Sequence, residues 1–285
     1  SSDVCSSDLE WNTFDKKMDR IAKRVKDDVE FFFGFSVLSQ ELPFSHLNLL
    51  LLEETPSLAA DTSERNVFLK VIDPTTLYMD VQSFGGSTQE MDAICDTLLK
   101  GGFRTLIVDL RKNGGGGLDS ALPFGECFAM DTVDAGYFVT NTWASKVTRP
   151  PSAAAFKDLP IAQERTTEAF IEALKTSEGR HLVLYPHTNA FKGNVYILTS
   201  NKTASTCEPI VDALKRSGRA TIVGENTAGA MLSAAMFQVS GKYHLFLPIA
   251  DYYNADLQRL DQVGVKPDIE VKADDALDHV LSLPR

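Results

Sequence analysis

The run Asn194-Val195-Tyr196-Ile197-Leu198-Thr199 is followed by Thr203-Ala204-Ser205-Thr206-Cys207-Glu208, and then by residues 209–215. The first run has the apolar pattern of a strand and the last has that of a helix, so the middle run lies at a strand-to-helix corner. A serine at such a corner suits a nucleophile, because the first N–H groups and the positive end of the helix face any anion formed there. Ser205-x-x-Glu208 also matches a capping box. Both interpretations stay open on this segment alone.

Strand and helix patterns alternate on both sides of this corner. Strands are predicted over residues 67–72, 77–81, 105–110, 136–140, 180–185, 194–199 and 220–223. Helices are predicted over residues 88–99, 118–129 and 209–215. Strands with helices between them indicate βαβ units, so we expect an α/β fold with a largely parallel sheet.

The first fifty residues are predicted to be mostly helical. Apolar residues recur in steps of three and four from Trp11 to Phe32, which predicts one amphipathic helix. A second helical or mixed segment covers residues 35–42, and Pro43 ends it. The polar connector over residues 56–65 then divides a small N-terminal helical domain, residues 10–58, from a larger domain, residues 64–285. Residues 1–9 repeat Ser-Ser-Asp and are expected to be a non-native scar.

The composition excludes several classes of function. A net charge of -11 without a long basic run argues against a nucleic-acid surface. The longest apolar segment, residues 47–52, is too short to span a bilayer. With Cys5 set aside, Cys95, Cys127 and Cys207 show no C-x-x-C spacing and no Cys/His cluster, so neither a zinc site nor a disulfide framework is expected. No cofactor-binding signature stands out.

The glycine run Gly114–Gly117 follows a predicted buried strand and precedes a helix. Its backbone N–H groups can point into a cavity, as an oxyanion hole requires. No Lys-Ser/Thr pair follows the glycines, so the run is not a phosphate loop. The alternative is a tight turn that needs positive φ angles.

A serine nucleophile needs a base, which is usually a histidine. Among the five histidines, His181 and His244 lie in strand patterns, His187 in a turn and His279 in the C-terminal helix. His46 follows Ser45 at the end of a helical segment, where a structural polar role is the alternative. Near the C-terminus, the loop over residues 260–268 contains two carboxylates, Asp261 and Asp268, which by themselves are explained as solvated turn residues.

Four segments in order carry a resemblance to a known family. These segments are residues 109–116, residues 203–208, Ile222-Val223-Gly224-Glu225-Asn226-Thr227-Ala228-Gly229, and Gly264-Val265-Lys266-Pro267-Asp268. Together they resemble the carboxy-terminal processing (tail-specific) serine proteases, over roughly residues 11–283. The resemblance implies a crotonase/ClpP-like α/β core, with Ser205 as the nucleophile and a peptide or protein as the substrate.

The resemblance also assigns the remaining site residues. The lysine that serves as base in the best-known branch of the family is replaced here by Ala230. The tricorn-type branch uses a serine-histidine pair and a C-terminal acid, and Ser45, His46 and Asp261 match these places, with aspartate where glutamate is usual. The oxyanion hole is expected at the N–H groups of Gly115 or Gly116 and Thr206. The ten-residue connector leaves no room for the PDZ domain that many members carry. Most relatives of this kind resemble envelope or secreted bacterial proteins, so the resemblance implies a periplasmic, envelope-associated or secreted location in a bacterium.

Alternatives to this assignment remain. Cys207 is a rival nucleophile in the same segment. The alternative is that Cys207 is buried and packs as a small hydrophobic residue. The fold that the resemblance implies also occurs in non-catalytic retinoid-binding proteins and in acyltransferases or hydratases of the crotonase core. The sequence leaves the oligomeric state open.

Overall fold

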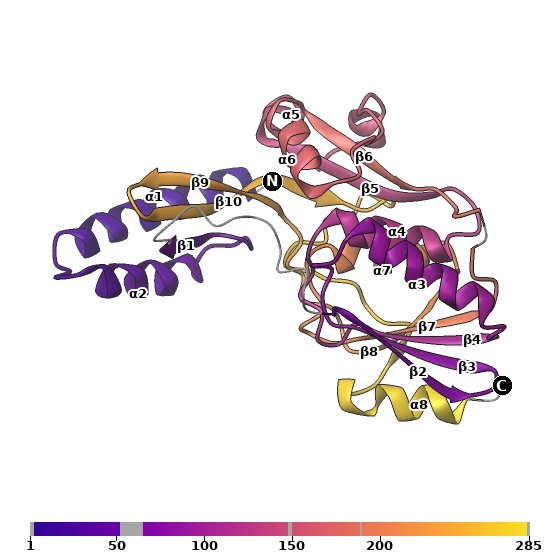
Figure 1. Cartoon of the computed structure of the whole chain (residues 1–285). Helices are drawn as coiled ribbons and strands as arrows, with labels where there is room; N and C mark the ends of the chain where they lie inside the picture. The colour runs from indigo at the N-terminus through magenta and orange to yellow at the C-terminus, as the bar shows by residue number, and fades with distance from the viewer. Residues whose placement is uncertain (1–2, 52–64, 148–149, 189, 284–285) are drawn as a thin grey trace.

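The computed structural model describes residues 3–51, 65–147, 150–188 and 190–283. These residues form two sheets with helices between them (Figure 1). The connector predicted around residues 56–65 and the boundary between the two predicted domains lie mostly outside the described residues.

The larger sheet has six strands in the order β11-β8-β7-β4-β3-β2. Its strands are β2 (Val67–Asp73), β3 (Thr76–Val81), β4 (Thr105–Asp109), β7 (Asn194–Thr199), β8 (Thr221–Gly224) and β11 (Ile269–Glu270). Every neighbouring pair is parallel except β2 with β3. The prediction of a largely parallel sheet is correct for this part of the molecule.

The second sheet is antiparallel throughout, which the sequence patterns did not predict. It joins β1 (Asn48–Leu51), β10 (Tyr243–Tyr253), β5 (Val133–Thr140) and β6 (Gly179–Leu184), and β9 (Ser233–Ser240) pairs with β10. In this sheet β1 pairs with β10, a strand nearly two hundred residues further along the chain. Local periodicity carries no information about such a partner.

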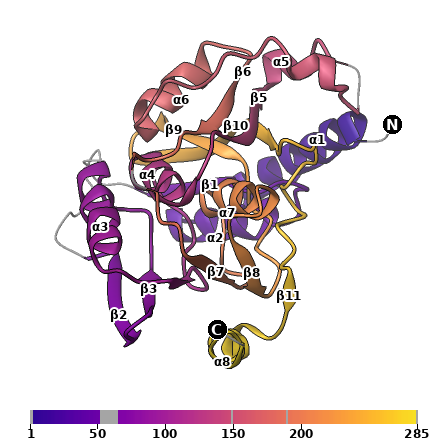
Figure 2. The same ribbon diagram turned by 90° about the vertical axis from the view of Figure 1, so that its right-hand side faces the viewer.

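Helices α3 (Thr88–Lys100), α4 (Leu118–Phe128) and α7 (Cys207–Arg216) lie between the sheets, and α8 (Ala276–Ser282) covers the other face of the larger sheet (Figures 1 and 2). The alternation of side chains along β4 explains these layers. Leu106 and Val108 belong to the main core with α3, α4 and α7, whereas Ile107 packs with Ala276 and Val280 of α8. Two shorter helices, α5 (Asn141–Ala144) and α6 (Thr167–Lys175), lie beside β5 and β6.

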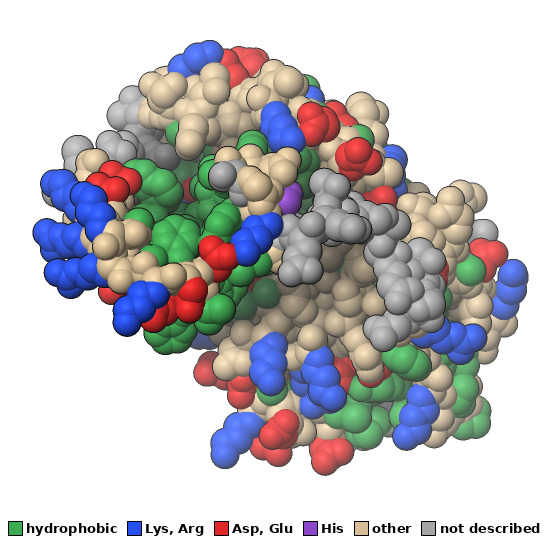
Figure 3. All heavy atoms as spheres, turned by 60° about the vertical axis from the view of Figure 1, so that its left-hand side comes forward, with side chains coloured by type: hydrophobic (Ala, Val, Ile, Leu, Met, Phe, Trp, Pro, Cys, Tyr) green, Lys and Arg blue, Asp and Glu red, His purple; other side chains and the backbone are tan. Residues whose placement is uncertain are grey.

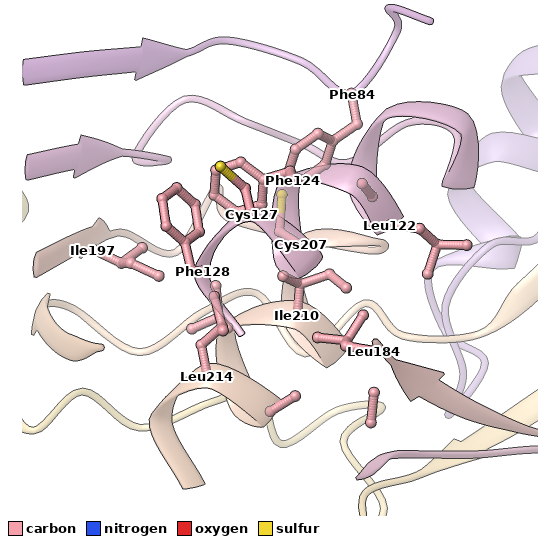
Figure 4. Close-up of a cluster of buried hydrophobic side chains, with 14 of the residues drawn as sticks. Phe84, Leu122, Phe124, Cys127, Phe128, Leu184, Ile197, Cys207, Ile210 and Leu214 are labelled. Atoms are coloured by element: carbon pink, nitrogen blue, oxygen red, sulfur yellow. The ribbon is translucent and has the colours of Figure 1, made fainter. Parts of the chain in front are cut away.

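The main core is aromatic and aliphatic, and it contains the three cysteines Cys95, Cys127 and Cys207. Figure 4 shows Cys127 and Cys207 among their hydrophobic neighbours. Cys95 on α3 and Cys127 on α4 form a disulfide, with Cα atoms 5.9 Å apart. The sequence led us to expect no disulfide framework, and this one bond was not foreseen. The two residues are 32 positions apart, and only the packing of α3 on α4 brings them together.

The helical N-terminal segment consists of two helices, α1 (Asp3–Ala22) and α2 (Asp28–Ser39), so the prediction of one continuous helix up to Phe32 is wrong. The Asp27 carboxylate accepts a hydrogen bond from the Glu30 N–H at 2.9 Å, and this N-cap starts a new helix. Together α1, α2, β1 and the β9–β10 hairpin form a projection that we call the N-terminal lobe (Figure 1). Its buried hydrophobic cluster consists of Phe14, Phe35, Leu38, Leu42, Leu47 and Leu49. Of the described helices, none has the length and apolar character needed to cross a membrane.

Candidate active site

Ser205 lies at the corner between β7 and α7, in a left-handed backbone conformation with φ of +57°. A non-glycine residue in this region is uncommon and is held there by its surroundings. The Ser205 N–H donates to the Ala230 carbonyl at 3.1 Å and also to Glu208 Oε2 at 3.1 Å. These bonds account for the corner that the sequence predicts.

Only half of the predicted capping box forms. The Glu208 carboxylate accepts the Ser205 N–H, but the Glu208 N–H bonds the Ser205 carbonyl rather than its hydroxyl. Helix α7 begins at Cys207, with Thr206 as its N-cap residue. The Ser205 hydroxyl is therefore not used as a helix cap.

The Glu208 side chain is fully buried and organises the loop opposite Ser205. Besides Ser205, it accepts hydrogen bonds from Thr227 Oγ1 at 2.6 Å, Gly229 N–H at 2.8 Å and Ala230 N–H at 2.9 Å. Burial raises the pKa of the Glu208 carboxyl, and these four donors act in the opposite direction. One carboxylate thus fixes both the corner and the loop over residues 227–230.

The glycine run passes directly beside Ser205. A Cβ atom on Gly115, whose φ is +105°, would lie 2.6 Å from the Cβ of Ser205. A Cβ atom on Gly116, whose φ is +147°, would lie 2.4 Å from the carbonyl carbon of Phe84. Both positions need glycine for this close approach. The interpretation of the run as a turn with positive φ is confirmed for these two residues.

The backbone N–H groups near Ser205 differ in whether they are free to bind a ligand. Gly115 donates its N–H to Asn113 Oδ1 at 2.9 Å. Within the described part of the chain, the N–H groups of Gly116 and Thr206 make no hydrogen bond. The Thr206 hydroxyl donates to the Gly116 carbonyl at 3.2 Å, which joins the two segments.

The structure also brings Ser45, His46 and Asp261 together. Ser45 Oγ lies 2.6 Å from His46 Nδ1 and donates to Asp261 Oδ1 at 2.7 Å. The aspartate side chain is long enough to make this contact. His46 lies in the turn before β1, also in a left-handed conformation with φ of +64°.

Asp261 is 1% exposed and is held by two further groups. Oδ1 accepts the Met231 N–H at 3.0 Å, and Oδ2 accepts a hydrogen bond from the Arg259 guanidinium at 3.1 Å. Arg259 also forms an ion pair with Asp251 of β10 at 2.7 Å. The Asp261 carboxylate is therefore fixed in position before any substrate arrives.

One peptide unit connects the two groups of residues. The carbonyl of Ala230 accepts the Ser205 N–H, and the N–H of the same peptide group, which belongs to Met231, donates to Asp261. With the dimensions of a peptide unit, these bonds place the Ser205 nitrogen no more than about 8.4 Å from Asp261 Oδ1. Ser205 and the Ser45-His46-Asp261 group therefore lie in one site, although no hydrogen bond joins the side chains of Ser205 and His46.

Burial lowers the pKa of the His46 imidazole, and the nearby Asp261 carboxylate partly offsets this effect. The ring also lies beside Phe246 of β10, with ring centroids 5.9 Å apart. Both features favour a neutral imidazole near pH 7.

Cys207 differs sharply from Ser205. It is fully buried in the main core, and burial raises the pKa of its thiol far above the usual range (Figure 4). Its Sγ atom contacts the carbonyl of Asn113 at 3.5 Å. A thiol in this setting is unreactive, because the thiolate is the nucleophilic form.

The other candidate side chains lie elsewhere. His181 is in β6, His244 in β10 and His279 in α8. Asp268 accepts the Ile222 N–H at 2.9 Å and forms an ion pair with Lys215, so it has a structural role. Within the described ranges, no group of three His, Cys, Asp or Glu residues could hold a metal ion.

Sequence reasoning missed two residues that position this site. Arg259 holds the Asp261 carboxylate, and Asn113 takes the Gly115 N–H. Asn113 precedes the glycines, and an asparagine there is a recognisable signal for a side chain that bonds its own loop. Nothing in the local sequence marks Arg259.

The left-handed Ser205, the glycine run beside it, His46 and the buried Asp261 thus make up the candidate site. The model of peptidase family S41 matches residues 75–271, so the chain belongs to this family. The family match covers all of the site described here except Ser45 and His46.

Two curated relatives are carboxyl-terminal-processing enzymes. The protease of Synechocystis sp. is 26% identical over 162 residues, which are 57% of this chain and 30% of that protein. The chloroplastic carboxyl-terminal-processing peptidase 3 of Arabidopsis thaliana is 32% identical over 74 residues, which are 26% of this chain and 14% of that protein. The chain thus matches less than a third of the length of either relative.

Solved structures share the fold at low sequence identity. A putative peptidase from Parabacteroides merdae has a TM-score of 0.59 at 17% identity, covering 90% of this chain and 81% of that one. A lipoprotein from Streptococcus agalactiae has a TM-score of 0.60 at 17% identity, covering 96% and 87%. The photosystem II D1 C-terminal processing protease has a TM-score of 0.52 at 18% identity, covering 78% and 53%. These similarities show the mixed α/β fold.

Proposed function

We propose that this protein is a serine endopeptidase of the tricorn type on a crotonase-like core, in which Ser205 is the nucleophile and His46 is the general base. The observation that carries the proposal is the Ser45 hydroxyl, which bridges His46 Nδ1 and Asp261 Oδ1. Ala230 at the position of the family's lysine leaves a histidine as the available base.

The bridge supports one tautomer of His46. A serine hydroxyl has one proton, and here it is donated to Asp261. The contact at 2.6 Å with Nδ1 must then be an N–H that donates to Ser45, so the lone pair of the neutral ring is on Nε2. This is the form that accepts a proton from a nucleophile.

The reaction follows from these roles. His46 Nε2 removes the proton from Ser205 as its oxygen attacks the carbonyl carbon of the scissile peptide. The tetrahedral oxyanion is stabilised by the N–H groups of Gly116 and Thr206, which are free of other partners within the described chain. The imidazolium then protonates the leaving amine, and water hydrolyses the acyl-enzyme by the reverse proton transfers. Gly115 shapes the site through its close approach to Ser205, because its N–H is bound to Asn113.

A fluorophosphonate probe and a peptide-hydrolysis assay test this assignment. We expect the probe to label Ser205 in the unmodified protein and to leave Ser205→Ala unlabelled. Peptide hydrolysis should be lost in Ser205→Ala and His46→Ala and retained in His279→Ala, a change in α8 away from the site. Thiol-selective alkylation should leave hydrolysis intact because Cys207 is buried. A folded protein that binds peptides but neither reacts with the probe nor cleaves them would instead be a binding module.

A further inference from the structure

The outer surface of the N-terminal lobe has an exposed apolar stripe along α2. Val29, Phe33 and Val37 follow one another at intervals of four residues, so they share one side of the helix. They are 73%, 69% and 47% exposed, respectively. The opposite side of α2 buries Phe35 and Leu38 in the core of the lobe. The stripe therefore contributes little to the packing of the lobe.

A row of cations accompanies the stripe. Lys16, Arg20, Lys23 and Arg24 lie on or directly after the last two turns of α1, and Lys26 follows in the turn before α2. All five are exposed, and within the described chain none of them forms an ion pair. Figure 3 shows Lys and Arg side chains gathered at the free end of the lobe, next to hydrophobic side chains.

The packing of α1 on α2 leaves both features on the outside of the lobe. Gly34 of α2 lies against Ile21 of α1, where even a Cβ atom would be 2.9 Å from the isoleucine side chain. The cation row and the apolar stripe each lie away from the buried Phe14, Phe35 and Leu38. Both features therefore lie on the outside of the helix pair, and they come together at the free end of the lobe, where Figure 3 shows cations next to hydrophobic side chains.

The acidic residues of the lobe reduce this positive charge only in part. Asp28 binds Lys242 and Tyr243, and Asp27 caps α2. Glu30 accepts the Lys26 N–H at 3.0 Å. Asp19 is three positions after Lys16 and four before Lys23, so it lies next to both and offsets part of their charge. Residues 20–26 at the free end of the lobe hold four cations and no acid, so this end is locally cationic in a protein whose net charge is -11.

We propose that this face of the N-terminal lobe docks on an anionic lipid surface. Apolar side chains on a helix can enter the boundary between headgroups and acyl chains while neighbouring cations bind acidic headgroups. The cations complement the charge of such a surface. The exposed apolar stripe suits a planar layer better than a peptide, because a peptide needs a groove. A second copy of the chain would have to accept the cation row as well. In a symmetric contact, this row would lie close to its own copy.

Vesicle flotation with the full chain tests the proposal. The probes are vesicles of phosphatidylcholine alone and vesicles that also contain phosphatidylglycerol. We expect binding to the anionic vesicles at low salt, weaker binding at high salt, and little binding to phosphatidylcholine. The double variant Phe33→Ser with Val37→Ser should lower the ratio of bound to free protein about tenfold. Arg20→Gln with Arg24→Gln should lower it roughly twentyfold.

Matched controls separate this effect from general changes of the surface. Val71→Ser alters a valine of β2 that is 61% exposed, and Lys157→Gln removes an exposed cation outside the lobe. Both controls should bind like the unmodified protein, and thermal melts should show every variant folded. Equal binding to both kinds of vesicle, no binding to anionic vesicles, or binding that neither double variant changes would overturn the proposal. So would dimers in sedimentation without lipid that the Phe33 and Val37 changes abolish.

Discussion

The Ser45 hydroxyl donates a hydrogen bond to Asp261 Oδ1 at 2.7 Å, although the two residues are 216 positions apart in the chain. Ser45 belongs to the N-terminal lobe, whereas Asp261 is anchored in the main body by Met231 and Arg259. The orientation of the proposed base, His46, therefore depends on a contact between the lobe and the loop that holds Asp261.

The change Ser45→Ala removes this bridge without altering the backbone. The imidazole then loses both its orientation and the preferred tautomer, so we expect kcat to fall about 100-fold. Steady-state kinetics on a peptide substrate measure the change. Ser45→Thr keeps a hydroxyl and should retain most of the activity, and equal losses in the two variants would contradict the role of the bridge.

The pH dependence of kcat/KM should follow the titration of His46. Burial lowers the pKa of this imidazole below its ordinary value of 6.5, and the protonated ring cannot act as a base. Activity should therefore be lost as the pH falls, with a midpoint below pH 6.5. The change Asp261→Asn removes the charge that raises the pKa of His46, so the residual activity should have its midpoint at a still lower pH. A midpoint that moves upward would be incompatible with this electrostatic picture.

Two adjacent glycines provide a test of the contact with Ser205. In Gly115→Ala the new Cβ would lie 2.6 Å from the Cβ of Ser205, and the backbone has φ of +105°. We expect hydrolysis and fluorophosphonate labelling to fall more than tenfold, because the corner must move. A Cβ on Gly114 has no atom within 4 Å, so Gly114→Ala serves as the matched control and should remain active. Similar losses in both variants would show that the loop tolerates no side chain for some other reason.

Glu208→Gln replaces a carboxylate that accepts four hydrogen bonds by an amide with one acceptor oxygen. Two of the donors are then left without a partner in a buried site. We expect the free energy of unfolding to fall by about 2–4 kcal/mol, measured in urea. Glu168→Gln, at an exposed position of α6, should leave stability unchanged. Unaltered stability in Glu208→Gln would mean that the loop satisfies its donors in another way.

The disulfide between Cys95 and Cys127 should stabilise the packing of α3 on α4. It closes a loop of 32 residues, so replacing both cysteines by alanine should cost about 3–4 kcal/mol of unfolding free energy under oxidising conditions. With a reductant in the denaturation experiment, the unmodified protein should approach the double variant. If the reductant has no effect, the two thiols do not form a bond in solution.

Several elements were predictable because their information is local. The apolar run of β7, the turn residues after it and the start of α7 identified the corner at Ser205. The buried run of β4 and the glycines that follow it located the loop beside that corner in the same way. Hydrophobic period and turn chemistry are properties of neighbouring residues, so they are readable without a structure. The break between α1 and α2 was missed because Val25 continues the helical spacing, although Asp27 supplied the capping signal.

The motifs in the sequence by themselves determined the order of the βα units and the short list of residues that could take part in catalysis. Only the tertiary structure decided which of them meet. It brought Asp261 to Ser45 and buried Cys207. It also directed the Gly115 N–H to Asn113, whereas the Gly116 N–H has no partner among the described residues. It also paired β1 with β10 in an antiparallel sheet. These outcomes depend on contacts between distant segments of the chain. The length of a side chain and the space around it decide whether such a contact forms, and no local sequence pattern contains this information.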